Sequence, residues 1–336
     1  MKKIKDIKLL IIGCGSIGKR HTRNAISIGV NPKNIISVDN RQDRLNEVKK
    51  MGIKNTFNNL NPALKKNFDV AIVCSPTSMH IQQSIKIAKL KKHILIEKPL
   101  DSKLIGSDKL NKITKKNNVT CMIAYIFRFH PGIKLIKNIL SKKIIGKVLY
   151  FRGEFSEYLP DWHPYEDYRK FYMAKKTQGG GSILDQCHIM DLSHYLLGEF
   201  SSVQAANFKI SKLEIKADDI SEMIVKHKNG AISSIHTDIF GRSHKKYLEI
   251  KGEMGNIYWN FYKNEVHLYE SKKKKTKIYK KFEKDFNKSY KEELKHFLTS
   301  SLKKNKSAIP LKEGISTMKL ILAAMKSSKL GKKIKV

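Results

Sequence analysis

The sequence of 336 residues lacks the features that define several classes of protein. Its only cysteines are Cys14, Cys74, Cys121 and Cys187, and their spacing forms neither a C-x-x-C pair nor a zinc-ligand pattern. We therefore expect reduced, structural thiols and no metal site. No apolar run approaches the roughly 20 residues that span a bilayer, and no signal-peptide cleavage site follows the basic start. We expect a cytoplasmic protein.

Acidic residues are scarce: 30 Asp and Glu stand against 67 Lys and Arg, which gives a formal net charge of +37. Such a charge is typical of nucleic-acid-binding proteins. Only eight of the basic residues are arginine, however, and the lysines are spread along the whole chain. The lysine runs also lack the interleaved aromatic residues that stack on bases. We interpret the charge as solvated surface that favours anionic small molecules, and we predict no specific nucleic-acid or membrane partner.

Short apolar segments alternate with helical patterns in the first third of the chain. The apolar segments have the continuous character of strands that are buried on both faces of a sheet. Repeated strand–helix units of this length predict a doubly wound parallel sheet, the Rossmann fold, over residues 1–124. The expected strands lie at residues 8–12, 35–39, 69–74, 93–97 and 119–124.

The pattern changes after about Tyr125, where longer and partly alternating strands follow one another. Runs of neighbouring strands predict an antiparallel sheet, and Asn229-Gly230 is a strong hairpin-turn signal. We therefore expect an α+β substrate domain with a large, mostly antiparallel sheet over residues 125–336. Two helices close the chain, and the segment 271–281 is expected to be a charged loop. The expected strands lie at residues 147–157, 203–210, 220–227, 231–238, 247–251 and 256–261.

A glycine-rich motif, Gly13-x-Gly15-x-x-Gly18, directly follows the first expected strand and opens a helix. In this context the first glycine permits the tight turn, the second lets the backbone approach a pyrophosphate, and the third allows close helix–strand packing. Free N–H groups at the helix start, around Ser16 and Ile17, and the positive end of the helix dipole then hold the phosphates. The motif predicts a dinucleotide-binding site.

The second expected strand ends on Asp39, 21 residues past Gly18. A carboxylate there accepts hydrogen bonds from the adenine ribose hydroxyls and repels a 2′-phosphate, which favours NAD over NADP. Arg41, two residues on, can instead pair with such a phosphate, so NADP stays open. We count Asn40, between these two residues, among the cofactor-binding candidates.

Two further loops follow buried strands of the predicted parallel sheet. Ligands bind at the carboxyl ends of such strands, so both loops are candidates for cofactor contact. In the first loop, Thr77 or Ser78 can equally serve only to cap a helix. In the second, Pro99 restricts the backbone, can be cis, and gives Lys98 a rigid base. The cofactor-binding candidates from these loops are Ser75, Pro76, Thr77, His80, Glu97 and Lys98.

A second unusual segment runs from Gly179 to Asp191 and begins with three glycines. Glycines permit a close approach of backbone to ligand. If a helix starts near Ser182, then Asp185, His188 and Asp191 lie along one face. A histidine between carboxylates can have its tautomer and basicity set by one of them. An ordinary amphipathic helix with surface pairs is the alternative.

These segments belong to a set of motifs that occurs in a fixed order over about the first 200 residues. The set contains Gly13-x-Gly15-x-x-Gly18 with Arg20-His21, Ser75-Pro76-Thr77-x-x-His80, Glu97-Lys98-Pro99, Tyr125-x-x-Arg128-x-His130-Pro131, and the glycines followed by Asp185-x-x-His188-x-x-Asp191. Together they resemble the glucose–fructose oxidoreductase, inositol dehydrogenase and MocA family. The resemblance is looser after residue 200.

The resemblance implies NAD(P)-dependent oxidation or reduction of a hydroxyl of a sugar, sugar acid, nucleotide sugar or cyclitol. It makes Lys98 catalytic, His188 the proton acceptor and Asp185 its partner. Many members space the last two residues four apart, whereas here they are three apart, as in a subgroup linked to surface-polysaccharide and nonulosonate-type sugar pathways. A dinucleotide-binding sensor of the same fold, without catalysis, is the alternative.

The expected mechanism joins these residues at one substrate oxygen. His188 takes its proton while the carbon passes hydride to the nicotinamide, and Lys98 stabilises the developing negative charge. Aromatic residues between 158 and 172 can face sugar rings, and Arg128, Arg169 and Lys176 can hold a diphosphate. We also expect a homodimer or homotetramer formed through the C-terminal sheet. The substrate-binding candidates are Tyr125, Arg128, His163, Tyr168, Arg169, Tyr172, Asp185 and His188.

Overall fold

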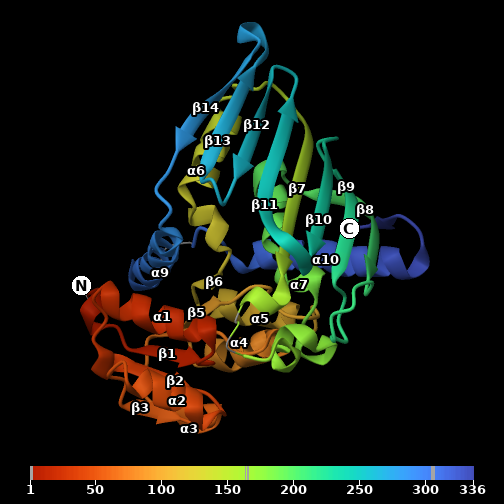
Figure 1. Cartoon of the computed structure of the whole chain (residues 1–336). Coiled ribbons are helices and arrows are strands. Elements are labelled where there is room, and N and C mark those ends of the chain that lie inside the picture. The colour runs from red at the N-terminus through yellow and green to blue at the C-terminus, as the bar shows by residue number, and fades with distance from the viewer. Residues whose placement is uncertain (1–2, 163, 165, 304–306) are drawn as a thin grey trace. The chain divides into compact units, whose positions relative to one another are not determined.

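The computed structural model describes residues 3–162, 164, 166–303 and 307–336 (Figure 1). The chain divides into two compact units. The first contains the residues up to Ile126 and the later segment Asn287–Ile315, and the second contains Phe127–Phe286 and Ser316–Val336.

A six-stranded sheet forms the centre of the first unit, with the order β3-β2-β1-β4-β5-β6 and every neighbouring pair parallel. The order reverses between β1 and β4, which is the point where such sheets bind nucleotides. The predicted Rossmann fold is confirmed. The strands are β1 Leu9–Ile12, β2 Ile35–Val38, β3 Asn55–Phe57, β4 Val70–Val73, β5 His93–Ile96 and β6 Cys121–Ile123, and the helices are α1 Ser16–Ser27, α2 Gln42–Lys49, α3 Leu60–Leu64, α4 His80–Lys89 and α5 Ser107–Lys116.

The first unit also takes in most of helix α9 (Phe286–Lys303) and the start of α10 (Leu311–Leu330). Leu294, Phe297 and Leu298 of α9 are fully buried, which explains why this late helix is part of a compact unit. The sequence-based division into 1–124 and 125–336 did not include this return of the chain. An amphipathic pattern shows that a helix has a buried face but not which sheet covers that face.

A nine-stranded sheet forms the second unit, with the order β14-β13-β12-β11-β7-β10-β9-β8-β15. Only the central pair β7–β10 is parallel among the described pairings, so the predicted large, mostly antiparallel sheet is confirmed. The strands are β7 Val148–Tyr158, β8 Phe200–Phe208, β9 Ile220–His227, β10 Ile232–Asp238, β11 Phe240–Gly252, β12 Gly255–Asn260, β13 Glu265–Glu270, β14 Lys275–Lys281 and β15 Ile334–Lys335, and the remaining helices are α6 Pro131–Ser141, α7 Ser182–Asp185 and α8 His188–Leu197.

The expectation of a charged loop at 271–281 was wrong, because residues 275–281 form the edge strand β14. Every residue of this strand is exposed. A strand without a buried face has no alternation of apolar and polar residues, so the usual sequence signal is missing. Backbone hydrogen bonds to β13 define it instead.

The two faces of the nine-stranded sheet differ in character. Along β7, Phe151 and Phe155 are buried on the inner face, while Arg152 is exposed on the outer face. Helix α8 packs on the inner face at Gly153, where an added Cβ would lie 2.4 Å from the side chain of Ile189. Because Ile189 follows His188 directly, this close packing fixes the start of α8 against β7.

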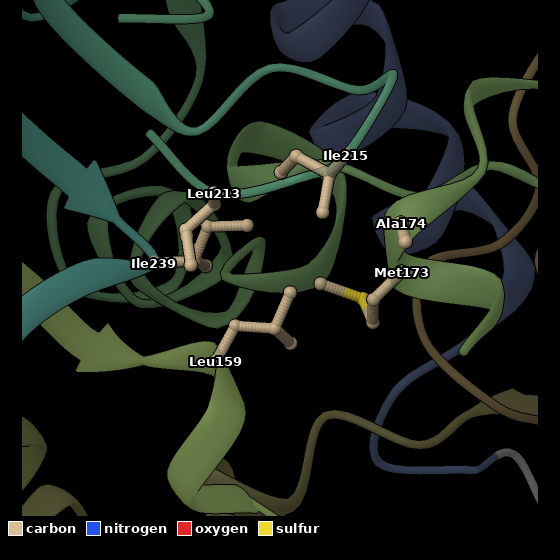
Figure 2. Packing of buried hydrophobic residues seen from close by; sticks show 6 residues of the cluster. All are labelled: Leu159, Met173, Ala174, Leu213, Ile215 and Ile239. Carbon is tan, nitrogen blue, oxygen red and sulfur yellow. The ribbon is translucent and has the colours of Figure 1, made fainter. Parts of the chain in front are cut away.

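A smaller apolar cluster orders the irregular segment after β7 (Figure 2). Tyr158, Trp162, Tyr168, Phe171 and Tyr172 pack against it, so most aromatic side chains of this segment have an apolar support. The cluster consists of Leu159, Met173, Ala174, Leu213, Ile215 and Ile239.

Candidate active site

The glycine loop between β1 and α1 has the geometry expected for a pyrophosphate site. A Cβ on Gly13, whose φ is +94°, would lie 2.4 Å from the carbonyl oxygen of Cys74, and one on Gly18 would lie 1.9 Å from that of Gly13. A Cβ on Gly15 would meet only the guanidinium of Arg44, at 3.6 Å. No side chain caps the start of α1 at Gly15. The loop is therefore closely packed on the protein side and open above the helix N-terminus, which fits a bound dinucleotide.

Asp39 is almost fully buried, and its carboxylate holds the glycine loop. One oxygen accepts a hydrogen bond from the backbone N–H of Cys14 at 2.7 Å, and the other accepts one from that of Arg41 at 2.9 Å. The guanidinium of Arg44 lies 3.7 Å from the same carboxylate. Arg44 was not among the sequence candidates, because no motif marks its position. The Arg41 guanidinium binds the exposed carboxylate of Asp43 through two hydrogen bonds.

The loops after β4 and β5 are tied together by His80. Its two ring nitrogens lie 2.9 Å from the carbonyl oxygen of Pro99 and 2.8 Å from that of Ser75. The hydroxyl of Ser75 donates to Gln83, and Thr77 is buried in a short helical turn. His80 therefore holds both loops at the carboxyl edge of the sheet. Pro76 lies in the same loop, and direct contacts of these residues with a cofactor stay predictions.

Glu97 and Lys98 stand at the end of β5, and the Lys98–Pro99 peptide bond is cis. The Glu97 carboxylate lies 2.6 Å from the Nε2 atom of His21, and both side chains are buried. Burial raises the pKa of Glu97, but the contacts with His21 and the charge of Lys98 outweigh this and hold the pKa below its ordinary value. His21 lies on α1, one turn past the glycine loop. The sequence motif contained His21, but only the structure gives it a partner.

The segment predicted as one helix from Ser182 is two helices. Helix α7 ends at Asp185 and α8 begins at His188, with Gln186 and Cys187 between them. The Asp185 carboxylate accepts a hydrogen bond from the Tyr172 hydroxyl at 2.9 Å. Asp185 and His188 are both buried to more than nine-tenths, so the break brings an acid and a histidine into one short, well-packed turn.

A phenylalanine supports the imidazole of His188. The Phe127 ring packs edge-on against it, with 4.9 Å between the ring centroids. Phe127 in turn contacts Phe155 and Phe261, at 5.3 and 5.5 Å between centroids. The His188 ring therefore rests on an aromatic layer over the inner face of the sheet.

The glycines before α7 serve protein packing. A Cβ on Gly180 would lie 2.2 Å from the carbonyl oxygen of Met173, and one on Gly181 would lie 2.3 Å from the carboxylate of Asp218. That carboxylate also accepts a hydrogen bond from the backbone N–H of Ile183 at 3.0 Å. Burial raises the pKa of Asp218 to about 6. The expected close approach of backbone to ligand is here an approach of backbone to protein.

Arg128 and Asp191 form a buried ion pair. Two hydrogen bonds of 2.9 and 2.6 Å join the guanidinium to the carboxylate, and the guanidinium also lies over the Tyr195 ring at 4.6 Å. Asp191 thus anchors α8, and Arg128 is held by it. This geometry supports Asp185 as the carboxylate that acts with His188, and substrate contact by Arg128 stays a prediction.

The remaining substrate candidates lie in different surroundings. The Tyr168 hydroxyl accepts a hydrogen bond from the backbone of Glu214 at 3.2 Å. The exposed guanidinium of Arg169 binds Asp167 and Glu214. Tyr125 is fully buried at the end of the parallel sheet in the first unit. His163 lies outside the described residues.

Comparison with known proteins gives the class of the chain. Residues 7–125 match the model of an oxidoreductase family's NAD-binding Rossmann fold, and residues 137–336 match the model of the same family's C-terminal alpha/beta domain. The glycine loop, the parallel sheet and these matches define an NAD-binding oxidoreductase. The chain belongs to the Gfo/Idh/MocA family.

Relatives of known activity align along nearly the whole chain. Myo-inositol 2-dehydrogenase of Thermotoga maritima is 29% identical over 98% of this chain and 98% of its own length. A levoglucosan dehydrogenase structure with NADH and levoglucosan has a TM-score of 0.86 at 20% identity, covering 98% of this chain and 99% of that one. The WlbA dehydrogenase of Bordetella pertussis, with NADH and UDP-GlcNAcA, has a TM-score of 0.83 at 18% identity, covering 98% and 97%.

These matches confirm the family predicted from the motifs, the NAD cofactor and the oxidoreductase class. The roles of individual residues stay predictions. Within the part of the chain that the structure describes, no helix combines the length and the apolar character needed to cross a membrane.

Proposed function

We propose that this enzyme transfers hydride between NAD and a hydroxyl-bearing carbon of a sugar, sugar acid, nucleotide sugar or cyclitol. The observation that carries the proposal is the turn between α7 and α8, where Asp185, held by Tyr172, precedes His188 by three residues. The relatives named for myo-inositol and levoglucosan support a cyclic, hydroxyl-rich substrate. The WlbA structure, with UDP-GlcNAcA, supports the nucleotide-sugar alternative.

Each of the three proposed catalytic residues has a distinct task. When bound, the nicotinamide accepts or supplies the hydride. His188 accepts the proton of the substrate hydroxyl, and Asp185 orients its imidazole. Lys98 donates a hydrogen bond to the same oxygen and stabilises its negative charge. The buried Glu97–His21 pair holds the backbone beside Lys98 in place.

The buried carboxylate of Asp39 favours NAD over NADP in this proposal, because a 2′-phosphate beside it meets like charge. Arg41 and Arg44 are the cations that can accept such a phosphate once that carboxylate is removed. The cofactor panel must therefore include both dinucleotides.

Cofactor reduction, followed by absorbance, tests the proposed function. The panel contains myo-inositol, levoglucosan, acidic sugars and UDP-linked sugars, each with NAD and with NADP. Turnover with at least one polyol supports the proposal. Tight NADH binding together with no turnover across the panel would instead support the sensor alternative.

Replacement of Lys98 by alanine is expected to lower kcat by at least about 10²-fold, because one donor to a developing oxyanion contributes that much. NADH binding, measured by fluorescence, is expected to stay within about threefold. Lys103→Ala, an exposed lysine in the same loop, is the control. Wild-type turnover by the Lys98 variant would remove this residue from the mechanism.

We also propose a cytoplasmic homo-oligomer that forms through the outer face of the nine-stranded sheet. Ile224 and Ile232, on the neighbouring strands β9 and β10, are 62% and 44% exposed there. On the same face, across β11 to β14, lies a hollow of about 320 Å³ lined by Glu249, Asn256, Tyr258, His267, Tyr269 and Thr276. Exposed apolar side chains and a concave surface on one face are typical of a protein interface.

A further inference from the structure

A charged cluster that the proposed mechanism does not use lies beside the α7–α8 turn. Glu157, near the end of β7, receives three hydrogen bonds. The Lys246 ammonium lies 2.9 Å from one carboxylate oxygen, and the Tyr262 hydroxyl donates to the same oxygen at 3.1 Å. The side-chain amide of Gln186 donates to the other oxygen at 3.1 Å. One carboxylate thus joins β7, β11, the turn after β12 and the α7–α8 turn.

The cluster occupies the inner face of the sheet. Glu157 continues the inward series of Phe151 and Phe155 along β7, and only 14% of its side chain is exposed. Lys246, 16% exposed, lies over the rings of Phe155 and Phe261 at 5.6 and 5.7 Å. These are the two rings that support Phe127 beneath His188. Two paths therefore lead from the cluster to the catalytic histidine, one through Gln186 and one through the aromatic layer.

The charge state of Glu157 suits this arrangement. Burial raises its pKa, but the ammonium of Lys246 and the donated hydrogen bonds outweigh burial and hold the pKa below its ordinary value. An ionised carboxylate accepts hydrogen bonds and donates none, which matches three donors. A buried ion pair contributes little net stability compared with apolar residues of the same volume, but it defines one geometry.

We propose that Glu157 is a positioning residue, which holds Gln186 and so sets the turn between Asp185 and His188. This inference rests on the proposed function. Gln186 is 2% exposed and immediately follows Asp185. Only it and Cys187 separate the two short helices, so the hydrogen bond from the Gln186 side chain to Glu157 ties this turn directly to the sheet. A displacement of about 1 Å in a catalytic group lowers turnover by about 10²-fold, which is why a short turn needs such an anchor.

The chain contains a matched control on the same strand. Glu154 accepts a hydrogen bond from the Tyr247 hydroxyl at 2.8 Å and lies 3.7 Å from the ammonium of Lys245. Its side chain is 17% exposed, close to the 14% of Glu157, but it lies on the outer face. Glu154→Gln therefore removes a charge from the same strand, with the same partner types, on the face away from His188.

The first test does not depend on turnover. Ring signals of ¹⁵N-labelled histidine are recorded for the full chain, and the His188 signals are identified by their loss in His188→Gln. Glu157→Gln and Gln186→Met are each expected to shift these signals, whereas Glu154→Gln leaves them unchanged. Unchanged His188 signals in both folded variants would overturn the proposal, whatever the substrate panel shows.

The second test uses the polyol that the wild-type enzyme oxidises fastest. Glu157→Gln and Gln186→Met are expected to lower kcat by about 10- to 100-fold with KM for NAD within about twofold, and Glu154→Gln leaves kcat unchanged. Glu157→Gln combined with Gln186→Glu restores the hydrogen bond in the opposite sense and is expected to recover part of kcat. Additive losses in that double variant would overturn the proposal. A wild-type enzyme that turns over no panel substrate would contradict the proposed function, while the histidine signals still decide the positioning role.

Discussion

Single glycines of the cofactor loop have separable tasks. The structure surrounds Gly18 with protein backbone, whereas the space beside Gly15 contains only the end of the Arg44 side chain. A methyl group at Gly18 must displace a carbonyl oxygen, but one at Gly15 displaces nothing rigid. The three glycines of one motif thus divide into two that pack the protein and one that leaves room for the phosphates.

We expect Gly18→Ala to lower the free energy of unfolding by more than about 2 kcal/mol, because the loop or α1 must shift. Gly15→Ala is expected to leave stability within about 0.5 kcal/mol and to weaken NADH binding at least tenfold. Chemical unfolding and NADH fluorescence measure the two effects. Equal losses of stability in both variants would contradict the division.

At this scale the sequence indicated much of the candidate site. The glycine loop, Glu97-Lys98-Pro99 and His188 occur in motifs whose offsets along the chain carry the signal. Glu157, Lys246 and Gln186 do not, because their partners lie far apart in sequence and none belongs to a local motif. Contacts that only the tertiary fold creates leave no mark on a single sequence.

At the scale of helices and strands, the region around His188 shows where prediction from the sequence fails. A helix starting near Ser182 was expected to run through Asp185 and His188, but the chain breaks between them. Gln186 and Cys187 form the break, and neither is a helix-breaking residue, so helix propensity does not predict it. Burial of the Gln186 amide against β7 and of Asp218 against the glycines fixes the two short helices instead.

Asp218, which binds the start of α7, makes the stability of the protein depend on pH. Burial raises its pKa to about 6, above the value of about 3.9 for an unfolded aspartate. The folded state therefore keeps a proton that the unfolded state releases, so stability falls as pH rises from about 4 to 6. Over this range Asp218 is expected to lower the free energy of unfolding by about 2 kcal/mol, and Asp218→Asn is expected to abolish this decrease. Urea unfolding at several pH values in this range measures the free energy of unfolding, with Glu253→Gln, at an exposed residue, as the control. The same slope of this free energy against pH in the wild type and the Asp218 variant would contradict the prediction.

Variants of the Arg128–Asp191 ion pair test whether this pair stabilises the position of α8. Arg128→Met leaves a buried carboxylate without its charge partner and is expected to lower the free energy of unfolding by about 3–5 kcal/mol. The double variant Arg128→Met with Asp191→Leu removes both charges and is expected to lose less than the single one. Urea unfolding compares the two. A double variant less stable than Arg128→Met would show that the charges themselves stabilise α8.

At the scale of the whole molecule, the sequence predicted both sheets and the class of enzyme, but not the edge strand β14 or the place of α9. The exposed edge strand has no apolar pattern, and α9 joins a unit whose sheet ends more than 150 residues earlier. Pattern-based prediction detects periodicity within a segment. It does not show which distant segments pack together.

The proposed assembly forms through the outer face of the nine-stranded sheet. Light scattering is expected to give a dimer or tetramer for the wild type and a smaller species for Ile224→Lys combined with Ile232→Lys, because buried lysines oppose association. Ile105→Lys, a highly exposed residue of the first unit, is the control. A monomeric wild type, or an unchanged assembly in the double variant, would contradict the proposed interface.

Residues 287–315 belong to the first unit but are synthesised long after its sheet, which affects folding during translation. The ribosome adds about 5–20 residues per second, so the cofactor-binding unit waits on the order of ten seconds for α9 after its sheet has emerged. During that interval the surface that later packs against Leu294, Phe297 and Leu298 is exposed to solvent. The second unit also contains late residues, Ser316–Val336. A chaperone that recognises nascent chains has its binding window on this protein before α9 appears.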